Sequence, residues 1–185
     1  MQQHREEENN MKKRILTAVL AAALVTGTCA ATVSAKEEKT YTIGICQLVQ
    51  HDALDAATKG FEDAITEKMG DSVKFDEQNA QGDSNTCSTI INSFVSEGAD
   101  LILANATASL QAAAAGTSDI PILGTAVTEY GVALGIDDFD GTVGGNISGT
   151  SDLAPLDEQA DMLHELFPDA KNVGLLYCSA EPNSQ

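Results

Sequence analysis

The spacing of apolar residues changes repeatedly between strand and helix periods from residue 41 onward. Residues 41–48 form an apolar run of strand length, and the next segment predicts a helix that Asp52 caps and Gly70 ends. The apolar side chains of that helix recur at helical spacing at Leu54, Ala57, Phe61, Ala64 and Ile65. Such a stripe lets one face of the helix cover a sheet.

The alternation of strand and helix continues to residue 124. Asp83 or Ser84 caps a second helix that ends at Gly98, and a third helix covers 107–115. The buried stripe of the second helix is predicted at Ile90, Ile91, Phe94 and Val95. Further strands are predicted at 72–77, 101–104 and 120–124. Because a parallel connection needs a crossover long enough to hold a helix, this order predicts an α/β lobe with a doubly wound, mostly parallel sheet.

The C-terminal part of the chain predicts the start of a second unit. Residues 141–149 are Gly-rich and are expected to form a loop or connecting segment, and 172–178 is expected to begin a fresh strand. Between them, an amphipathic helix is predicted from Leu156, Ala160, Leu163 and Phe167. A lone strand cannot form a sheet of its own. We therefore expect a first lobe at 36–150 and a truncated second lobe that opens at 151–185.

The first 35 residues are expected to be an export signal. A basic stretch precedes an uncharged apolar run that is too short to span a bilayer, and small residues lead to a cleavage site before Lys36. Lipoprotein processing at Cys29 is the alternative, and translation begins at Met1 or Met11. We expect an extracytoplasmic protein, in the periplasm or at the cell surface, with a lipid anchor as the alternative to soluble export.

The net negative charge of the chain limits the kinds of molecule that it can bind. The formal net charge is −18, and residues 36–185 hold 6 of the 10 basic and 25 of the 28 acidic side chains, a net charge of −19. Such a surface repels nucleic-acid phosphates and anionic headgroups, so we expect no nucleic-acid partner and a neutral, zwitterionic or cationic ligand. The hydrophobic fraction of 43% is that of a globular protein, and we expect a monomer.

The sequence lacks the common motifs of enzymes and cofactor sites. It has no GxSxG, GxxxxGK[ST] or HExxH, and no GxGxxG after the first strand, so we expect no enzyme activity and no cofactor. Cys46, Cys87 and Cys178 would remain after export, and this odd, widely spaced set argues against a disulfide framework or a zinc site. Two of them, Cys46 and Cys178, lie in strand-like runs and are expected to pack as small core residues.

Polar residues follow each predicted strand, at the edge where open parallel sheets bind ligands. They are Gln47, Gln50, His51, Asn79, Asn105, Thr107, Ser109, Thr125 and Thr128. The helix predicted to start near Thr107 would point free N–H groups at this crevice, which suits the carboxylate of an amino acid. Two alternatives stay open: Thr107 and Ser109 cap their own helix, and His51 and His164 are surface histidines.

An ordered series of motifs across 41–185 resembles the substrate-binding proteins of ABC transporters that take up tryptophan and related aromatic amino acids. The series is IGICQ at 43–47, HDALD at 51–55, NAQGD at 79–83, DLILA at 100–104, TAVT at 125–128, GGNISGTSD at 144–152 and EPNS at 181–184. The resemblance implies two α/β lobes of the type I periplasmic-binding fold. These lobes would close over a small ligand and deliver it to a membrane permease.

Together with the strand-end rule, the resemblance gives a predicted ligand-binding set. It consists of Gln47, His51, Thr107, Ala108, Ser109, Thr125, Ala126, Glu181, Asn183 and Ser184. Thr107 and adjacent amides would hold the ligand carboxylate, and Glu181 would orient its ammonium group. The chain departs from the family at Ala108, where proline is frequent, and at 129–130, where Glu-Tyr stands in place of Asp-Pro.

Other functions remain as alternatives. A sugar- or nucleoside-binding protein would share the fold, and so would the effector-binding lobe of a transcriptional regulator. The export signal and the lack of a helix-turn-helix before Tyr41 count against the regulator. With 4% aromatic residues and no tryptophan, an aromatic ligand would have to stack on the few Phe and Tyr side chains or on the second lobe.

Overall fold

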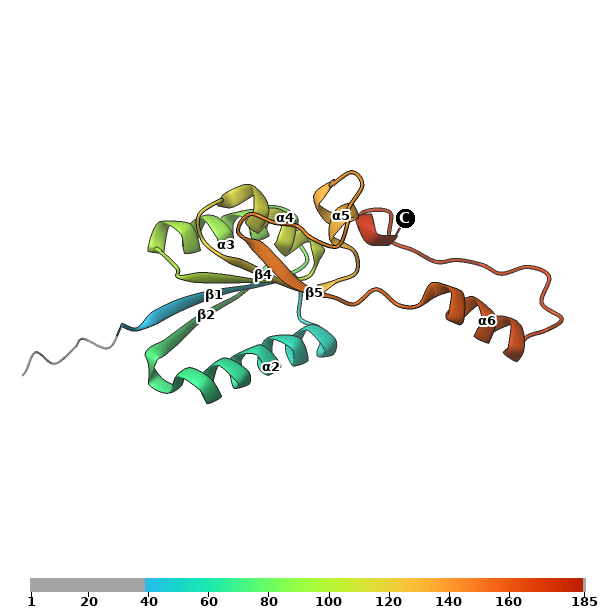
Figure 1. Ribbon diagram of the computed structural model, residues 1–185, viewed down its shortest axis with the longest axis horizontal. Helices are drawn as coiled ribbons and strands as arrows, with labels where there is room; N and C mark the ends of the chain where they lie inside the picture. Colours follow the sequence, from blue (N-terminus) through green and yellow to red (C-terminus); the bar gives the residue numbers. More distant parts are fainter. Residues whose placement is uncertain (1–38, 185) are drawn as a thin grey trace, which may run out of the picture. The chain divides into compact units, whose positions relative to one another are not determined.

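The computed structural model describes residues 39–184, in which five parallel strands alternate with helices (Figure 1). The predicted export signal, its cleavage site and Cys29 lie outside these residues. The strands are β1 (Tyr41–Gln47), β2 (Val73–Asn79), β3 (Leu101–Asn105), β4 (Ile122–Val127) and β5 (Ile147–Ser151). The helices are α2 (Asp52–Met69), α3 (Ser84–Glu97), α4 (Thr107–Gly116), α5 (Tyr130–Leu134) and α6 (Leu156–Leu166), with the short 3-10 helices η1 (Gly70–Ser72) and η2 (Pro182–Ser184).

The strands are ordered β2-β1-β3-β4-β5, and every pair is parallel. Figure 1 shows α2 on one face of this sheet and α3 and α4 on the other. The chain moves from β1 outward to β2 through α2, and from β3 outward to β4 through α4, so its connections leave the centre in opposite directions. This arrangement confirms the predicted doubly wound α/β fold.

Alternate residues of β1 supply the two faces of the core. Ile43 and Ile45 pack with Leu103 beneath α2, where Phe61 and Ile65 cover them. The intervening residues, such as Cys46, point to the other face. There the core contains Cys87, Ile90, Ile91 and Phe94 of α3 with Leu110, Ala112 and Ala113 of α4. Both faces of the central strands are therefore dry, as a parallel sheet requires.

The residue that caps α3 is one of the two predicted, whereas the residue that caps α2 differs from the prediction. His51, and not Asp52, caps α2, because the Nδ1 atom of His51 accepts a hydrogen bond of 3.2 Å from the N–H of Ala53. Asp83 caps α3 by accepting hydrogen bonds from the N–H groups of the second and third residues of the helix. Gly98 ends that helix with φ 74°, a left-handed conformation that favours glycine.

The predicted loop at 141–149 is partly wrong, since its last three residues belong to β5. This strand pairs with β4 in parallel register, from Ile122 opposite Ile147 onward. Its sequence, ISGTS, has little apolar character, and pairing rather than hydrophobicity fixes it in the sheet. The short helix α5 was not predicted; the carboxylate of Glu129 caps it through the N–H groups of Gly131 and Val132.

The strand predicted at 172–178 does not form among the described residues. This segment is extended and exposed, with Leu175 at 89% and Leu176 at 102% of full exposure, because it lies beside no other strand. Cys178 is accordingly exposed, which corrects its expected place in a core. The predicted amphipathic helix is present as α6, yet each of its residues is exposed. Within 39–184, no helix has the length and apolar character to cross a bilayer.

Candidate functional site at the carboxyl edge of the sheet

The carboxyl ends of β1 and β3 lie side by side at one edge of the sheet, and we refer to this predicted ligand-binding edge as the crevice. These neighbouring strands end in register at Gln47 and Asn105, and Asn105 in turn lies opposite Thr125 of β4. The chain leaves β1 toward α2 on one face of the sheet and β3 toward α4 on the other, which is the arrangement at which open parallel sheets bind ligands (Figure 1). The structure therefore brings Gln47, Thr107 and Thr125 to one edge, as the sequence predicted.

A buried hydrogen-bond network supports this edge from the side of α2. The amide nitrogen of Gln47 donates to the Asp55 carboxylate at 2.6 Å, and its amide oxygen accepts from the Thr58 hydroxyl at 2.7 Å. Asn105 donates to the Thr58 hydroxyl and to the carbonyl of Leu54, both at 2.9 Å. Gln47 and Asn105 are at most 2% exposed. Their side chains thus hold α2 against the strand ends and do not project into the crevice.

The helix α4 begins in the crevice without a side-chain cap. Its N-cap residue is Ala106, with φ 91° and ψ 162°, a conformation that residues other than glycine rarely adopt. The N–H of Ala106 donates to the carbonyl of Thr125, which ties the start of the helix to β4. The alternative that Thr107 and Ser109 cap their own helix does not apply, because neither side chain does so. The first turn of α4 therefore keeps backbone donors at the crevice.

The C-terminal segment returns to the start of α4. The side-chain amide of Asn183 donates to the Thr107 hydroxyl at 3.3 Å, and its own N–H donates to the carboxylate of Glu181 at 3.2 Å. The side-chain oxygen of Asn183 is buried without a hydrogen-bond partner. Glu181, Asn183 and Ser184 are half-buried. Residues 76 positions apart in the sequence, Thr107 and Asn183, are thereby brought together.

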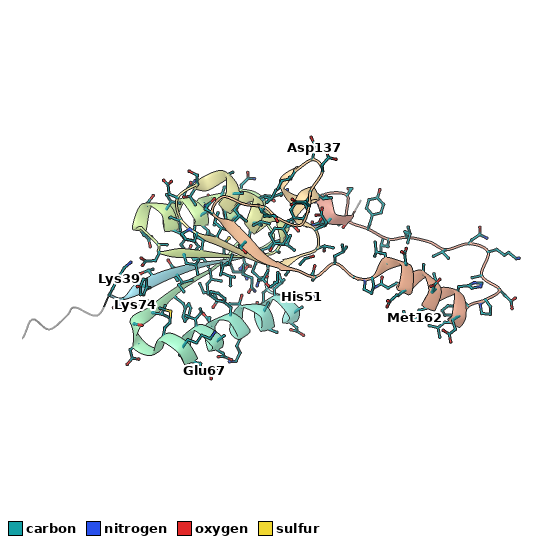
Figure 2. All side chains as sticks on the ribbon, in the orientation of Figure 1. Lys39, His51, Glu67, Lys74, Asp137 and Met162 are labelled. Atoms are coloured by element: carbon teal, nitrogen blue, oxygen red, sulfur yellow. The ribbon has the colours of Figure 1, made fainter. Side chains whose placement is uncertain are left out.

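The remaining predicted residues lie in different surroundings. Ser109 is completely buried, with its Oγ atom 3.6 Å from the sulfur atoms of Cys46 and Cys87, so it faces the core and not the crevice. His51 is exposed at the start of α2; Figure 2 shows it at the carboxyl end of the sheet, with Lys39 and Lys74 at the other end. Ala108 is half-buried in the first turn of α4, and Ala126 has φ 54° in an irregular part of β4.

Sequence reasoning missed Asp55, Thr58 and the strain at Ala106. The apolar stripe of α2 gave no sign that Thr58 is buried, although a threonine at helical spacing from that stripe could have been noticed. Nothing in the sequence marks an alanine that adopts a positive φ.

A separate hollow of about 560 Å³ lies beside β5. Apolar side chains dominate its lining, which includes Tyr130, Phe139, Val143, Ile147 and Leu153. It contains none of the residues of the predicted ligand-binding set. Among residues 39–184, no group of three His, Cys, Asp or Glu side chains is placed to hold a metal ion.

Comparison with known proteins gives a consistent result. The family described as ABC transporter substrate binding protein matches residues 42–185. A tyrosine-binding protein of Clostridioides difficile (strain R20291) is 45% identical over 151 residues, which are 80% of this chain and 44% of that protein.

Solved structures agree with this relationship. An ABC domain in complex with L-Trp from Streptococcus pneumonia is 35% identical, with a TM-score of 0.73 over 79% of this chain and 50% of the other. The ligand-free, open structure of a substrate-binding protein with adhesive properties from Clostridium difficile is 42% identical, with a TM-score of 0.64 over 78% and 50% of the two chains. The chain thus spans about half the length of the relatives that it matches.

Proposed function

The chain belongs to the family of ABC transporter substrate-binding proteins, and we propose that it is the extracytoplasmic solute-binding part of an amino-acid importer. The proposed ligand is an aromatic amino acid, tyrosine or tryptophan. Two relatives support this class, since one is a tyrosine-binding protein and the other is a structure in complex with L-Trp. Capture and release break no bond, so we propose no enzymatic activity. The permease of the transporter would be the membrane partner.

One observation supports the amino-acid site most directly: the uncapped start of α4 faces the crevice beside Thr107 and Asn183. Backbone N–H groups at a helix start carry partial positive charge and bind carboxylates. In the proposed complex, these groups and the Thr107 hydroxyl hold the ligand carboxylate. Asn183 and Glu181 lie within reach of the same space, and the carboxylate of Glu181 would attract the ligand ammonium.

We further propose that the described lobe is one half of a two-lobed clamp. The apolar side chains exposed at 153–177 support this proposal, because a folded protein covers most such residues. The largest exposures among them are those of Leu156, Leu166, Phe167, Leu175, Leu176 and Tyr177. A second lobe that begins with α6 and 172–178 would bury them. The ligand would then stabilise the closed state through contacts with both lobes.

The last part of the proposal is that the chain is exported from the cytoplasm. The basic and apolar pattern of the first 35 residues supports a signal peptide, and the family works outside the cytoplasm. Soluble release after residue 35 is proposed, with lipid attachment at Cys29 as the alternative. The acidic surface supports a monomer that does not bind nucleic acid.

A thermal-shift screen of the complete reading frame tests the ligand class. L-tyrosine, L-tryptophan and L-phenylalanine are compared with sugars and nucleosides. A ligand at a hundredfold excess over its Kd stabilises the folded state by about 2.7 kcal/mol, which is easily measured. Stabilisation by a sugar or a nucleoside and by none of the three amino acids would refute the proposed ligand.

The carboxylate site is tested with Thr107→Val, which keeps the shape of the side chain and removes its hydroxyl. We expect the Kd for the amino acid to rise about tenfold or more, because hydrogen bonds to charged groups contribute about 1.5–3 kcal/mol. Thr89→Val is the matched control, since Thr89 is exposed on α3 and bonds only within its helix. Equal Kd values for the two variants would contradict the assignment.

A further inference from the structure

Three small polar side chains meet in the core and take no part in the proposed ligand site. The sulfur atoms of Cys46 in β1 and Cys87 in α3 each lie 3.6 Å from the hydroxyl oxygen of Ser109 in α4. All three residues are completely buried. Because both sulfur atoms contact one oxygen, they also lie near each other. The fold thus pairs two cysteines that are far apart in the sequence.

We propose that Cys46 and Cys87 form a disulfide when the chain folds outside the cytoplasm, which joins β1 to α3 next to the crevice. The inference rests on the export that the proposed function includes, because disulfides persist in oxidising compartments. Cys46 directly precedes Gln47, the last residue of β1. A cross-link at this position would fix the strand end that carries the network of Gln47, Thr58 and Asn105.

The helix α3 packs closely on β1 in the region of the two cysteines. A disulfide needs Cα atoms about 4.4–6.8 Å apart, closer than most strand and helix residues approach. Close packing of the two elements is seen at Gly44, where an added Cβ atom would lie 2.6 Å from the ring of Phe94, on the same helix as Cys87. Cys46 is two residues after Gly44 and points to the same face of the sheet. The shared contact of both sulfur atoms with the Ser109 hydroxyl, in this closely packed region, is the observation that supports the cross-link.

The chemistry requires an external disulfide as oxidant. One chain thiolate attacks that disulfide, releases one thiol and forms a mixed disulfide; the second chain thiolate then displaces the carrier sulfur. In sum, the two cysteines lose two protons and two electrons, and the external disulfide is reduced to two thiols. A small-molecule disulfide or an exported dithiol oxidoreductase in its oxidised form supplies this reaction.

Burial decides when the reaction takes place. In the folded protein, desolvation raises the pKa of the Cys46 thiol to about 12, so this group is almost never the reactive thiolate. Exchange therefore occurs during folding, while both cysteines are still accessible. After folding, the same burial shields the bond from reductants. Cys178 is exposed and is the competing partner that the experiment must remove.

The test uses the full chain with Cys29→Ser and Cys178→Ser, so that Cys46 and Cys87 are the two remaining cysteines. The protein is unfolded in urea with reductant and refolded with oxidised and reduced glutathione. Alkylation after the refolded protein is unfolded again in urea without reductant, followed by mass spectrometry, counts the free thiols, and peptide mapping identifies the linked residues. Two further variants, with Cys46→Ser or Cys87→Ser added, are the matched controls and can form no internal bond.

We expect most refolded molecules to lose both thiols. The cross-link closes a loop of about 40 residues, so the Tm of the linked form should exceed that of the reduced form by on the order of 10 °C. Two alkylatable thiols in refolded protein with a native circular dichroism spectrum would overturn the proposal, and so would an equal or lower Tm of the linked form. The thiol count needs no ligand, so this outcome is independent of the thermal-shift screen that tests the proposed function.

Discussion

Replacing Gly44 by alanine is expected to destabilise the protein, although the same change usually stabilises. Gly44 lies in the middle of β1, where the ring of Phe94 packs directly on the backbone. An added Cβ atom would lie 2.6 Å from two ring atoms and 2.9 Å from a third. Phe94 is 1% exposed, so its ring has no free space into which to move.

The magnitude follows from two opposing effects. Overpacking of a core costs about 1–3 kcal/mol. The gain from restricting the unfolded chain is about 0.4–1 kcal/mol, since the backbone of Gly44 suits alanine. The net loss in the free energy of unfolding should therefore be about 1–2 kcal/mol, which lowers the Tm by about 2–8 °C.

The assay is urea denaturation of Gly44→Ala beside Gly60→Ala. Gly60 is exposed within α2, and an added Cβ atom there meets nothing within 4 Å, so this control should gain up to about 1 kcal/mol. Adding Phe94→Leu to Gly44→Ala should recover part of the loss, which a double-mutant cycle measures. If Gly44→Ala were as stable as the unchanged protein, the close packing of α3 on β1 would be refuted.

Three further predictions concern single contacts. Thr58→Val removes one hydrogen bond from each of two buried amides, Gln47 and Asn105, and should cost about 1–3 kcal/mol in urea denaturation; an unchanged midpoint would refute the network. Asp83→Ala removes the cap of α3 and should cost about 1 kcal/mol, seen as a lower midpoint in the same assay. The hydrogen bond from Lys39, together with that from the N–H of Thr42, lowers the pKa of Asp100. These bonds to the carboxylate therefore stabilise the folded state above the unfolded pKa of about 3.9. The stabilisation is lost as the pH falls through the lower folded pKa. Asp100→Asn should therefore be less stable than the unchanged protein at pH 7, and the difference should shrink as the pH falls below the unfolded pKa of about 3.9; a difference that does not change with pH would contradict this.

Most of the first lobe could be predicted from sequence because its strands and helices have distinct periods. The runs at 41–48 and 101–104 are short and apolar, as buried parallel strands are, and Gly70 and Gly98 mark the helix ends. β5 escaped prediction because its side chains are small and polar, and Gly149 lies where a Cβ atom would meet the Tyr130 hydroxyl. Pairing with β4 makes it a strand, and that contact has no local signal.

The segment 172–178 is the opposite case to β5, because a strand was predicted there and does not form. Its residues favour a strand by composition, but a strand also needs a neighbour with which to pair, and none lies beside it among residues 39–184. The local pattern describes what a segment is suited to form. The contacts decide whether it forms.

The position of the candidate site could be predicted, whereas the direction of its side chains could not. The strand-end rule selected Gln47 and Thr107 because topology alone brings strand ends together. Every residue from Ile43 to Gln47 is buried, so no alternation of polar and apolar positions distinguishes the core side from the rim. For this reason Gln47 and Ser109 were expected at the ligand, whereas the structure shows Gln47 bonded to Asp55 of α2 and Ser109 in contact with two cysteines of the core.

The chain leaves β1 and β3 in opposite directions, and this separates the residues at the edge of the sheet from the residues of the core. The polar loop residues that follow those strand ends lie outside the core clusters beneath α2 and α3, so substitutions there change the chemistry of this edge and leave the packing of the sheet unchanged.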